Sequence, residues 1–490
     1  MLPSLFGDHM VVQRDQPIRV WGWTDPNIEV MARLADRQAS SKSDANGRFD
    51  IQLKGLPAGG PFELVVTAQD QEKRFQDVLS GEVWICSGQS NMQWSVGQSN
   101  DAALECLAAN NDQIRLISVP QVGVQEPQRD FNGSWSKANP DTVRDFSAVG
   151  YFFGRQLQQT LNVPIGLIDD AWGGSAAEAW VPKDVLDDDG RFQPLMEQWE
   201  TMMANYDFEK LTATWQQKRE AWVAGGKKGN APRAPRNMAN GNQRPANIYN
   251  GVLHPTVGYG IRGVIWYQGE SNSSRAYQYR DLFPLMIQTW RELWDQGDFP
   301  FYYVQLADFM AETESPAESA WAELREAQTM TMDKLDNVGQ AVIINLGEAS
   351  DIHPKNKQDV AKRLARWALA KDYGYEISYR SPQYTSMTQA ANGRLRVDFD
   401  HVGEGLDTFD TNRLVGFTIA GDDKVFHDAE AKMVDRDTVE VWSTDVDAPV
   451  AVRYGWADNP VCNVQSKAGL PLTPFRTDDW NGVTADRVTR

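Results

Sequence analysis

The chain has 490 residues, 41% of them hydrophobic and 23% charged, and this length predicts two or three domains rather than one. It carries 48 lysines and arginines against 67 aspartates and glutamates, and the net charge of −19 disfavours nucleic acid and anionic membranes as partners. The sequence has no run of about 18 apolar residues, so it predicts no membrane span. The three cysteines are too few for a disulfide framework and lack metal-binding spacing.

Residues 1–78 are predicted to form an N-terminal β-domain. Short segments that alternate apolar and polar residues, with turn residues between them, are typical of a small β-sandwich. These segments lie at 18–23, 45–49 and 62–66. Trp21 and Trp23 belong to the first of them. Aromatic residues in short strands usually pack in the core, so that role is preferred here over a carbohydrate-binding one.

Residues 79–375 alternate strands with helices. Helices are predicted over 147–161, 279–290 and 354–374, because apolar residues recur there every three or four positions. Strands are predicted between them, at 83–85, 165–168, 264–267, 301–304 and 341–344. Such alternation predicts an α/β fold in which helices cover both faces of a parallel sheet, as in a three-layer αβα sandwich.

Two further segments depart from this alternation. Residues 183–245 interrupt it, and the glycine-rich stretch 225–232 predicts a flexible loop. A lid over the site and an inert surface excursion are both consistent with this insertion. Residues 376–490 are strand-like again, which predicts a C-terminal β-domain. Its clearest strand segments are 395–399, 417–419 and 439–442.

The stretch 82–94 combines a strand with a small, polar turn. Apolar residues lead up to Ser87, and Gly88 then permits a sharp change of direction before Ser90. This arrangement predicts Ser90 at the carboxyl end of the sheet, where open α/β sheets bind their ligands. The turn is not the G-x-S-x-G nucleophile elbow, because position 92 is Met.

Four ordered motifs give the chain a family resemblance. They are SGQSNM at 87–92, WGGS at 172–175, WYQGESN at 266–272 and DIHP at 351–354. In this order they resemble the blocks of the SGNH hydrolases, in particular the sialate O-acetylesterase group and related carbohydrate acetylesterases. Segments 5–14 and 474–478 also resemble that group. The resemblance implies an SGNH-type αβα sandwich flanked by β-sandwich-like domains. It also implies a periplasmic or secreted enzyme whose signal segment is absent from this sequence.

Only one of the five histidines lies in a position that suits catalysis. His353 follows the last predicted strand of the sheet, on the same edge as Ser90, so it is predicted as the general base. Asp351, two residues earlier, is predicted to orient the imidazole. Many SGNH enzymes have this Asp three residues before the His, and the alternative for this segment is a helix cap with a solvated histidine. The other histidines are His9, His254, His401 and His427.

The oxyanion of an ester intermediate needs hydrogen-bond donors. We predict the Ser90 and Gly174 backbone N–H groups and the side-chain amide of Gln268, with Asn272 as the alternative to Gln268. Substrate-binding candidates are Asn91, Trp172, Glu270 and Asn272, although a loop-bracing role is preferred for Glu270. Nearby aromatic residues could form a glycan platform, but with 18 tryptophans in the chain a core role is preferred. These aromatics are Trp94, Trp172, Trp180 and Tyr267.

The predicted function is a serine esterase that removes O-acetyl groups from carbohydrates through an acetyl-enzyme. Neither a metal nor an organic cofactor is predicted, and the partner is an acetylated glycan. The main alternative is an acetylesterase of xylan or another plant polysaccharide. A non-catalytic glycan-binding protein and an esterase of lipid or aryl substrates are the others, while scattered histidines argue against a metal hydrolase. Activity is predicted to fall below pH 6.5, where an ordinary histidine becomes protonated. The sequence does not indicate an oligomeric state.

Overall fold

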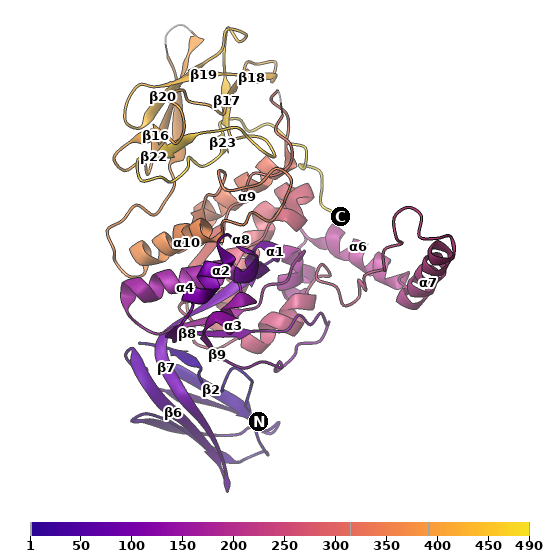
Figure 1. Cartoon of the computed structure of the whole chain (residues 1–490), viewed down its shortest axis with the longest axis vertical. Helices are drawn as coiled ribbons and strands as arrows, with labels where there is room; N and C mark the ends of the chain where they lie inside the picture. Colours follow the sequence, from indigo (N-terminus) through magenta and orange to yellow (C-terminus); the bar gives the residue numbers. More distant parts are fainter. Residues whose placement is uncertain (1, 314, 391–392, 490) are drawn as a thin grey trace.

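The computed structural model of the protein describes residues 2–313, 315–390 and 393–489. Figure 1 shows strands of the N-terminal part at one end of the long axis and strands of the C-terminal part at the other. A layer of helices around a central sheet lies between them. The mixed α/β fold predicted from the sequence is confirmed.

The N-terminal part is built from strands that pair antiparallel with one another, while β1 runs parallel to β7 (Gln71–Gly88). β2 pairs with β5, and β3 pairs with both β4 and β6. Burial alternates along β3 and β5, as expected of strands with one face in a core and one in water. The elements are β1 (Val11–Gln13), β2 (Ile18–Trp23), β3 (Glu29–Leu34), β4 (Arg37–Lys42), β5 (Arg48–Leu53) and β6 (Gly59–Ala68).

The strand β7 (Gln71–Gly88) joins this part to the central sheet. Its first half pairs with β6, its middle with β1, and its second half with two strands of the central sheet. Its first residues are mostly exposed and the rest, from Val78 onward, are buried. The domain boundary predicted between residues 78 and 79 therefore falls inside one continuous strand.

The central sheet has the order β13-β12-β11-β7-β10-β8-β9. From β13 to β8 neighbouring strands run parallel, and β9 is antiparallel at one edge, so the predicted all-parallel sheet needs this one correction. The sequence prediction missed β8. The strands are β8 (Asn111–Ser118), β9 (Ser136–Ala138), β10 (Ile165–Asp169), β11 (Gly263–Tyr267), β12 (Phe301–Val304) and β13 (Val338–Ala341).

The fifth predicted strand, at 341–344, is displaced by three residues from β13. The ladder with β12 ends at Ala341. Val342 and Ile344, which make this stretch so apolar, pack instead in the core of the C-terminal part. Their hydrophobicity therefore reflects contact between the two parts rather than strand pairing.

Helices cover both faces of the central sheet. Val83 and Ile85 of β7 belong to the core beneath α8 (Ala276–Trp294) and α9 (Ala320–Lys334). Trp84 and Cys86 point to the opposite core, beneath α4 (Ala148–Leu161) and α10 (Lys357–Lys371). This alternation is the period-two pattern of a strand buried on both faces. The smaller helices near the sheet are α1 (Ser90–Gln93), η1 (Val96–Gln98), α2 (Ala102–Ala108), α3 (Pro140–Arg144), η2 (Ala177–Trp180), η3 (Tyr249–Leu253), η4 (His254–Thr256) and η5 (Glu270–Arg275).

The insertion at 183–245 contains helices that the sequence analysis did not predict. They are α5 (Lys183–Asp188), α6 (Gln193–Ala204) and α7 (Phe208–Ala224). Figure 1 shows α7 projecting away from the central layer, and none of its residues is buried. Its weak amphipathic pattern gives no apolar face for a periodicity argument to detect.

Within residues 376–390 and 393–489, the C-terminal part contains two four-stranded antiparallel sheets and a small two-stranded one. The sheet orders are β14-β15-β20-β19, β18-β17-β21-β23 and β16-β22. These strands enclose their own hydrophobic core. They are β14 (Gln383–Gln389), β15 (Leu395–Asp400), β16 (Leu406–Thr408), β17 (Phe417–Ala420), β18 (Phe426–Asp428), β19 (Glu430–Met433), β20 (Thr438–Trp442), β21 (Ala451–Tyr454), β22 (Val464–Ser466) and β23 (Phe475–Arg476).

Candidate active site

The topology of the central sheet creates a site at the carboxyl end of β7. The chain adds β8 and β10 on one side of β7 and then crosses to add β11, β12 and β13 on the other. Such a reversal leaves a crevice at the carboxyl ends of the strands, where ligands of open α/β sheets bind. Ser90 follows β7 at this point. The loops that begin near Trp172 and Gln268 follow β10 and β11, on either side of it.

A glycine turns the chain sharply before Ser90. Gly88 has a φ of +134°, and a Cβ at this position would lie 2.3 Å from the carbonyl oxygen of Tyr267. Only glycine permits this close pairing of β7 with β11. The Gln89 N–H donates to the same oxygen at 2.9 Å, and Ser90 then begins α1. Ser90 is consequently held at the end of the strand by backbone geometry.

His353 and Asp351 lie in the loop between β13 and α10. The Nε2 atom of His353 is 2.9 Å from Ser90 Oγ. Its Nδ1 atom is 3.4 Å from Asp351 Oδ1, an ion-pair distance somewhat longer than an ordinary hydrogen bond. The same carboxylate oxygen accepts the His353 backbone N–H at 2.9 Å. The structure thus brings together the three side chains that the sequence predicts as catalytic.

Trp94 stacks on the imidazole of His353. Their ring centroids are 4.7 Å apart and the planes are inclined by 13°. The indole N–H of Trp94 donates to the Gln98 carbonyl at 2.9 Å, which fixes the ring. Burial lowers the pKa of His353 below its ordinary value of 6.5, although the Asp351 carboxylate opposes this shift. A lowered pKa keeps the imidazole neutral, and able to accept a proton, at a lower pH.

Two backbone N–H groups beside Ser90 are free to bind an anion. Within the described parts of the chain, neither the Ser90 nor the Gly174 N–H donates a hydrogen bond. Gly173 lies against the nucleophile, since a Cβ on it would be 3.3 Å from the Cβ of Ser90. Gly174 has a φ of +72°, which glycine adopts without strain. These two donors agree with the positions predicted for an oxyanion hole.

Asn242 determines the direction of one of these donors. Its Nδ2 donates a short hydrogen bond to the Gly173 carbonyl. That carbonyl and the Gly174 N–H belong to the same planar trans peptide, so they point in opposite directions. Gln243 donates to the next carbonyl, that of Gly174, at 3.1 Å. Asn242 lies in the insertion, and no sequence pattern connected it with the glycines.

The prediction for Gln268 is wrong, because its side-chain amide is already occupied. Its Nε2 donates to Ser175 O at 3.1 Å and to Asn272 Oδ1 at 2.8 Å, while its Oε1 accepts from Tyr279 at 2.9 Å. The side chain is fully buried. Gln268 therefore has no hydrogen left for an oxyanion and instead holds the loop after β11.

Asn272, the alternative donor and a predicted substrate contact, is also buried. Its Oδ1 accepts the Ala177 N–H at 3.0 Å, and its Nδ2 donates to Glu178 at 2.9 Å. Glu178 forms a buried ion pair of 2.6 Å with Arg275. Only 1% of Asn272 is exposed, so the structure contradicts a role in substrate contact. Its amide links η2 to η5 behind the site.

Asn91 belongs to a buried network behind Ser90 rather than to a substrate surface. Its Nδ2 donates to Glu270 Oε1 at 2.6 Å and to the Ile352 carbonyl at 3.0 Å. Its Oδ1 accepts from Lys357 Nζ at 2.5 Å. The substrate role predicted for Asn91 is therefore wrong, whereas the preferred bracing role of Glu270 agrees with this network. Of the other predicted contacts, Trp172 remains partly exposed at the rim.

Lys357 is the charged member of this network that the sequence analysis missed. It is fully buried, and burial lowers its pKa from 10.5 to about 7, although Glu270, Asp351 and Glu348 oppose the shift. Its Nζ lies 5.1 Å from the centre of the Tyr267 ring. One signal was available, because Lys357 precedes Val360 and Ala361 by three and four residues. It therefore continues the apolar stripe of α10.

Among the described residues, no group of three or more His, Cys, Asp or Glu side chains forms a potential metal site. Within residues 2–313, 315–390 and 393–489, no helix is long and apolar enough to cross a membrane.

A serine, an imidazole and a carboxylate in hydrogen-bonding sequence, next to free backbone N–H groups, define the site of a serine hydrolase. The family profile described as "carbohydrate esterase, sialic acid-specific acetylesterase" matches residues 80–218 and 243–370. This match covers more than half of the 490 residues. The chain belongs to that carbohydrate esterase family, as the sequence motifs predicted.

Relatives agree with this assignment over most of the chain. The sialate O-acetylesterase of Mus musculus is 29% identical over 446 residues, which cover 81% of this chain and 78% of the mouse protein. That of Homo sapiens is 30% identical over 416 residues, covering 77% and 72%. The crystal structure of a novel carbohydrate acetylesterase from Xanthomonas citri matches with a TM-score of 0.83 at 37% identity. It covers 98% of this chain and 100% of that one.

Proposed function

We propose that this protein removes O-acetyl groups from carbohydrates, with Ser90 as nucleophile, His353 as general base and Asp351 as the group that orients it. The observation that carries the proposal is the 2.9 Å contact between Ser90 Oγ and His353 Nε2, at a position next to two unoccupied N–H donors. Family membership supports the same chemistry.

In the first half of the reaction, Ser90 Oγ attacks the acetyl carbonyl carbon while His353 Nε2 takes the hydroxyl proton. The negative charge on the carbonyl oxygen is stabilised by the Ser90 and Gly174 N–H groups. When the intermediate collapses, the sugar oxygen leaves with the proton held by His353. The products of this half are the deacetylated sugar and an acetyl ester on Ser90.

In the second half, His353 takes a proton from water, which attacks the acetyl-enzyme. Collapse of this intermediate returns the proton to Ser90 Oγ and releases acetate. Asp351 stabilises the cationic imidazole in both halves and keeps Nε2 directed at the serine.

The substrate is proposed to be an O-acetylated sugar of the kind named for the relatives, with O-acetylated sialic acid as the first candidate. Acetylated xylan or another plant polysaccharide is the alternative, because the net charge of −19 provides no general attraction for an acidic sugar. Trp172 is proposed to contact the sugar at the rim. The family resemblance also supports a periplasmic or secreted location, which fractionation of the native cells would test.

The deciding experiment measures acetate release by the wild-type protein and by Ser90→Ala from O-acetylated sialic acid, acetylated xylan and an aryl acetate. We expect wild-type turnover of at least one substrate and a loss of about 10³-fold or more in the variant. Circular dichroism checks that Ser90→Ala is folded. Release that survives the substitution would contradict the proposed nucleophile. A wild-type protein inactive on all three substrates would favour the glycan-binding alternative.

A further inference from the structure

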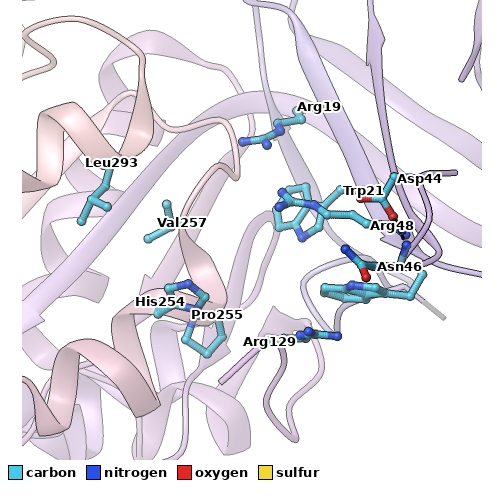
Figure 2. Close-up of a pocket in the computed structure, with 11 residues that line it drawn as sticks. Arg19, Trp21, Asp44, Asn46, Arg48, Arg129, His254, Pro255, Val257 and Leu293 are labelled. Atoms are coloured by element: carbon cyan, nitrogen blue, oxygen red, sulfur yellow. Dashed lines mark hydrogen bonds between the residues drawn. The ribbon is translucent and has the colours of Figure 1, made fainter. Parts of the chain in front are cut away.

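A cavity of about 720 Å³ lies between the N-terminal strands and the central layer. Figure 2 shows Trp21, Arg19, Arg48 and Asn46 on one side of it, and His254, Pro255, Val257 and Leu293 on the other. Arg129, from the segment between β8 and β9, completes the lining. Segments far apart in the sequence therefore build one concave surface, of the size that proteins use for small ligands.

This cavity is separate from the acetyl-cleaving site. The wall that carries Trp21 belongs to the part that adjoins β7 through β1, where Gly81 pairs with Gln13. Ser90 lies beyond Gly88, at the other end of the same strand. The seven-residue rise from Gly81 to Gly88 alone corresponds to about 23 Å. None of the described residues that line the cavity belongs to the loops that carry Ser90, Gly174 and His353.

The cavity offers aromatic surface together with guanidinium groups. Arg19 lies 5.7 Å from the centre of the Trp21 ring, and Arg129 lies 5.7 Å from that of Trp23. Trp21 is buried, whereas Trp23 is partly exposed. Aromatic rings with a polar edge suit the CH faces of a pyranose ring, and guanidinium groups suit carboxylates, which they bind in a bidentate manner.

The charges in the cavity are only partly neutralised. Asp50 is 2.6 Å from Arg19 and 3.7 Å from Arg48, so one carboxylate serves two guanidinium groups. Asp44 accepts backbone N–H groups of its own turn at 2.8 and 2.9 Å. The Arg129 guanidinium is exposed, and no hydrogen bond or ion pair to it occurs in the described chain. In a protein of net charge −19, this cavity therefore keeps one unpaired positive group.

We propose that this cavity binds an acidic oligosaccharide, with the carboxylate of a uronic or sialic acid on Arg129 and the sugar ring against the tryptophan wall. A neutral sugar would leave the Arg129 guanidinium without an anionic partner. The site would hold a glycan chain while Ser90 acts elsewhere on it, but its ligand binding does not depend on the proposed esterase activity.

The test is calorimetric titration of Ser90→Ala protein, which prevents turnover, with a trigalacturonate, a sialyllactose and neutral cellotriose. We expect at least one acidic oligosaccharide to bind with a Kd of about 1 mM or tighter and to bind more weakly as salt is raised. In the Ser90→Ala protein, a second substitution, Arg129→Ala, should weaken this binding about tenfold. That is the loss expected for one ionic contact of about 1.4 kcal/mol. The acidic ligand that binds identifies the type of carboxylate recognised.

Arg33→Ala is the matched control, because Arg33 is an exposed arginine on β3 that does not line the cavity. It should leave binding unchanged. The proposal is overturned if neither acidic oligosaccharide binds, if cellotriose binds equally well, or if Arg33→Ala and Arg129→Ala weaken binding to the same extent. Acetate is not measured, so none of these outcomes bears on the esterase proposal.

Discussion

Replacing Lys357 by methionine tests the buried network behind Ser90. The substitution keeps the approximate length of the side chain and removes its charge and its hydrogen bond to Asn91. In the wild type the Lys357 amine has no solvent exposure, and the carboxylates that favour its charged form are Glu270, Asp351 and Glu348. The cost of burying that charge depends on pH, whereas the methionine side chain does not titrate.

The magnitude follows from the lowered pKa. Burial lowers the pKa of Lys357 from 10.5 to about 7, so between these values the unfolded chain binds a proton that the folded chain does not. The free energy of unfolding therefore rises with pH in this window. Lys357 contributes about −4 kcal/mol at pH 7 and about −2 kcal/mol at pH 9, a change of roughly 2 kcal/mol in favour of the folded wild type.

The assay is urea unfolding of the wild type and Lys357→Met, followed by tryptophan fluorescence at pH 7, 8 and 9. The stability of the wild type relative to the variant should rise by roughly 2 kcal/mol across this range. Lys362→Met is the control for loss of a positive charge from the same helix, since 62% of the Lys362 side chain is exposed. A stability difference between wild type and Lys357→Met that stays constant from pH 7 to pH 9 would refute the reasoning.

Three further predictions concern the reaction itself. The acid limb of the kcat/KM profile should have its midpoint below pH 6.5, because burial lowers the pKa of His353, and a midpoint above that value would contradict the assignment. Trp94→Ala should move this midpoint upward by exposing the imidazole, and lost stacking of about 1 kcal/mol should lower kcat roughly fivefold. An unchanged profile would show that the indole does not shield the ring. Asn242→Ala should lower kcat about tenfold with little change in KM, since it frees the peptide that directs the Gly174 N–H. A rise in KM alone would instead indicate a role in binding substrate.

The sequence predicted the part of the site that depends on strand ends. Ser90 and His353 each follow an apolar strand, so their meeting at one edge of the sheet could be expected from topology alone. Long helices with a clear apolar stripe, such as α4 and α8, were predicted for the same reason. Their period of 3.6 residues is set by burial and is visible in the residues themselves.

Side-chain partners could not be predicted in the same way. Gln268 and Asn272 are polar residues in a motif, and the sequence cannot distinguish an amide that faces a substrate from one whose hydrogens are used internally. Three hydrogen bonds of the Gln268 side chain, one to Ser175 on the loop after β10 and two to residues of η5 and α8, decide the matter. The helix α7 was missed because it has no buried face. The strand predicted at 341–344 is displaced by three residues from β13, because Val342 and Ile344 pack in the core of the C-terminal part rather than in the sheet.

The continuous strand β7 also sets a distance. Its 18 residues run without a break from the N-terminal sheet into the central sheet, and a hydrogen-bonded strand neither stretches nor bends freely. The N-terminal part is therefore not a module on a flexible tether that samples many positions around the catalytic serine. The strand holds this part at a fixed distance from Ser90. A glycan held at its end would meet Ser90 only at one spacing along the polymer, so the acetylation pattern, as well as the acetyl group, would decide which chains are processed.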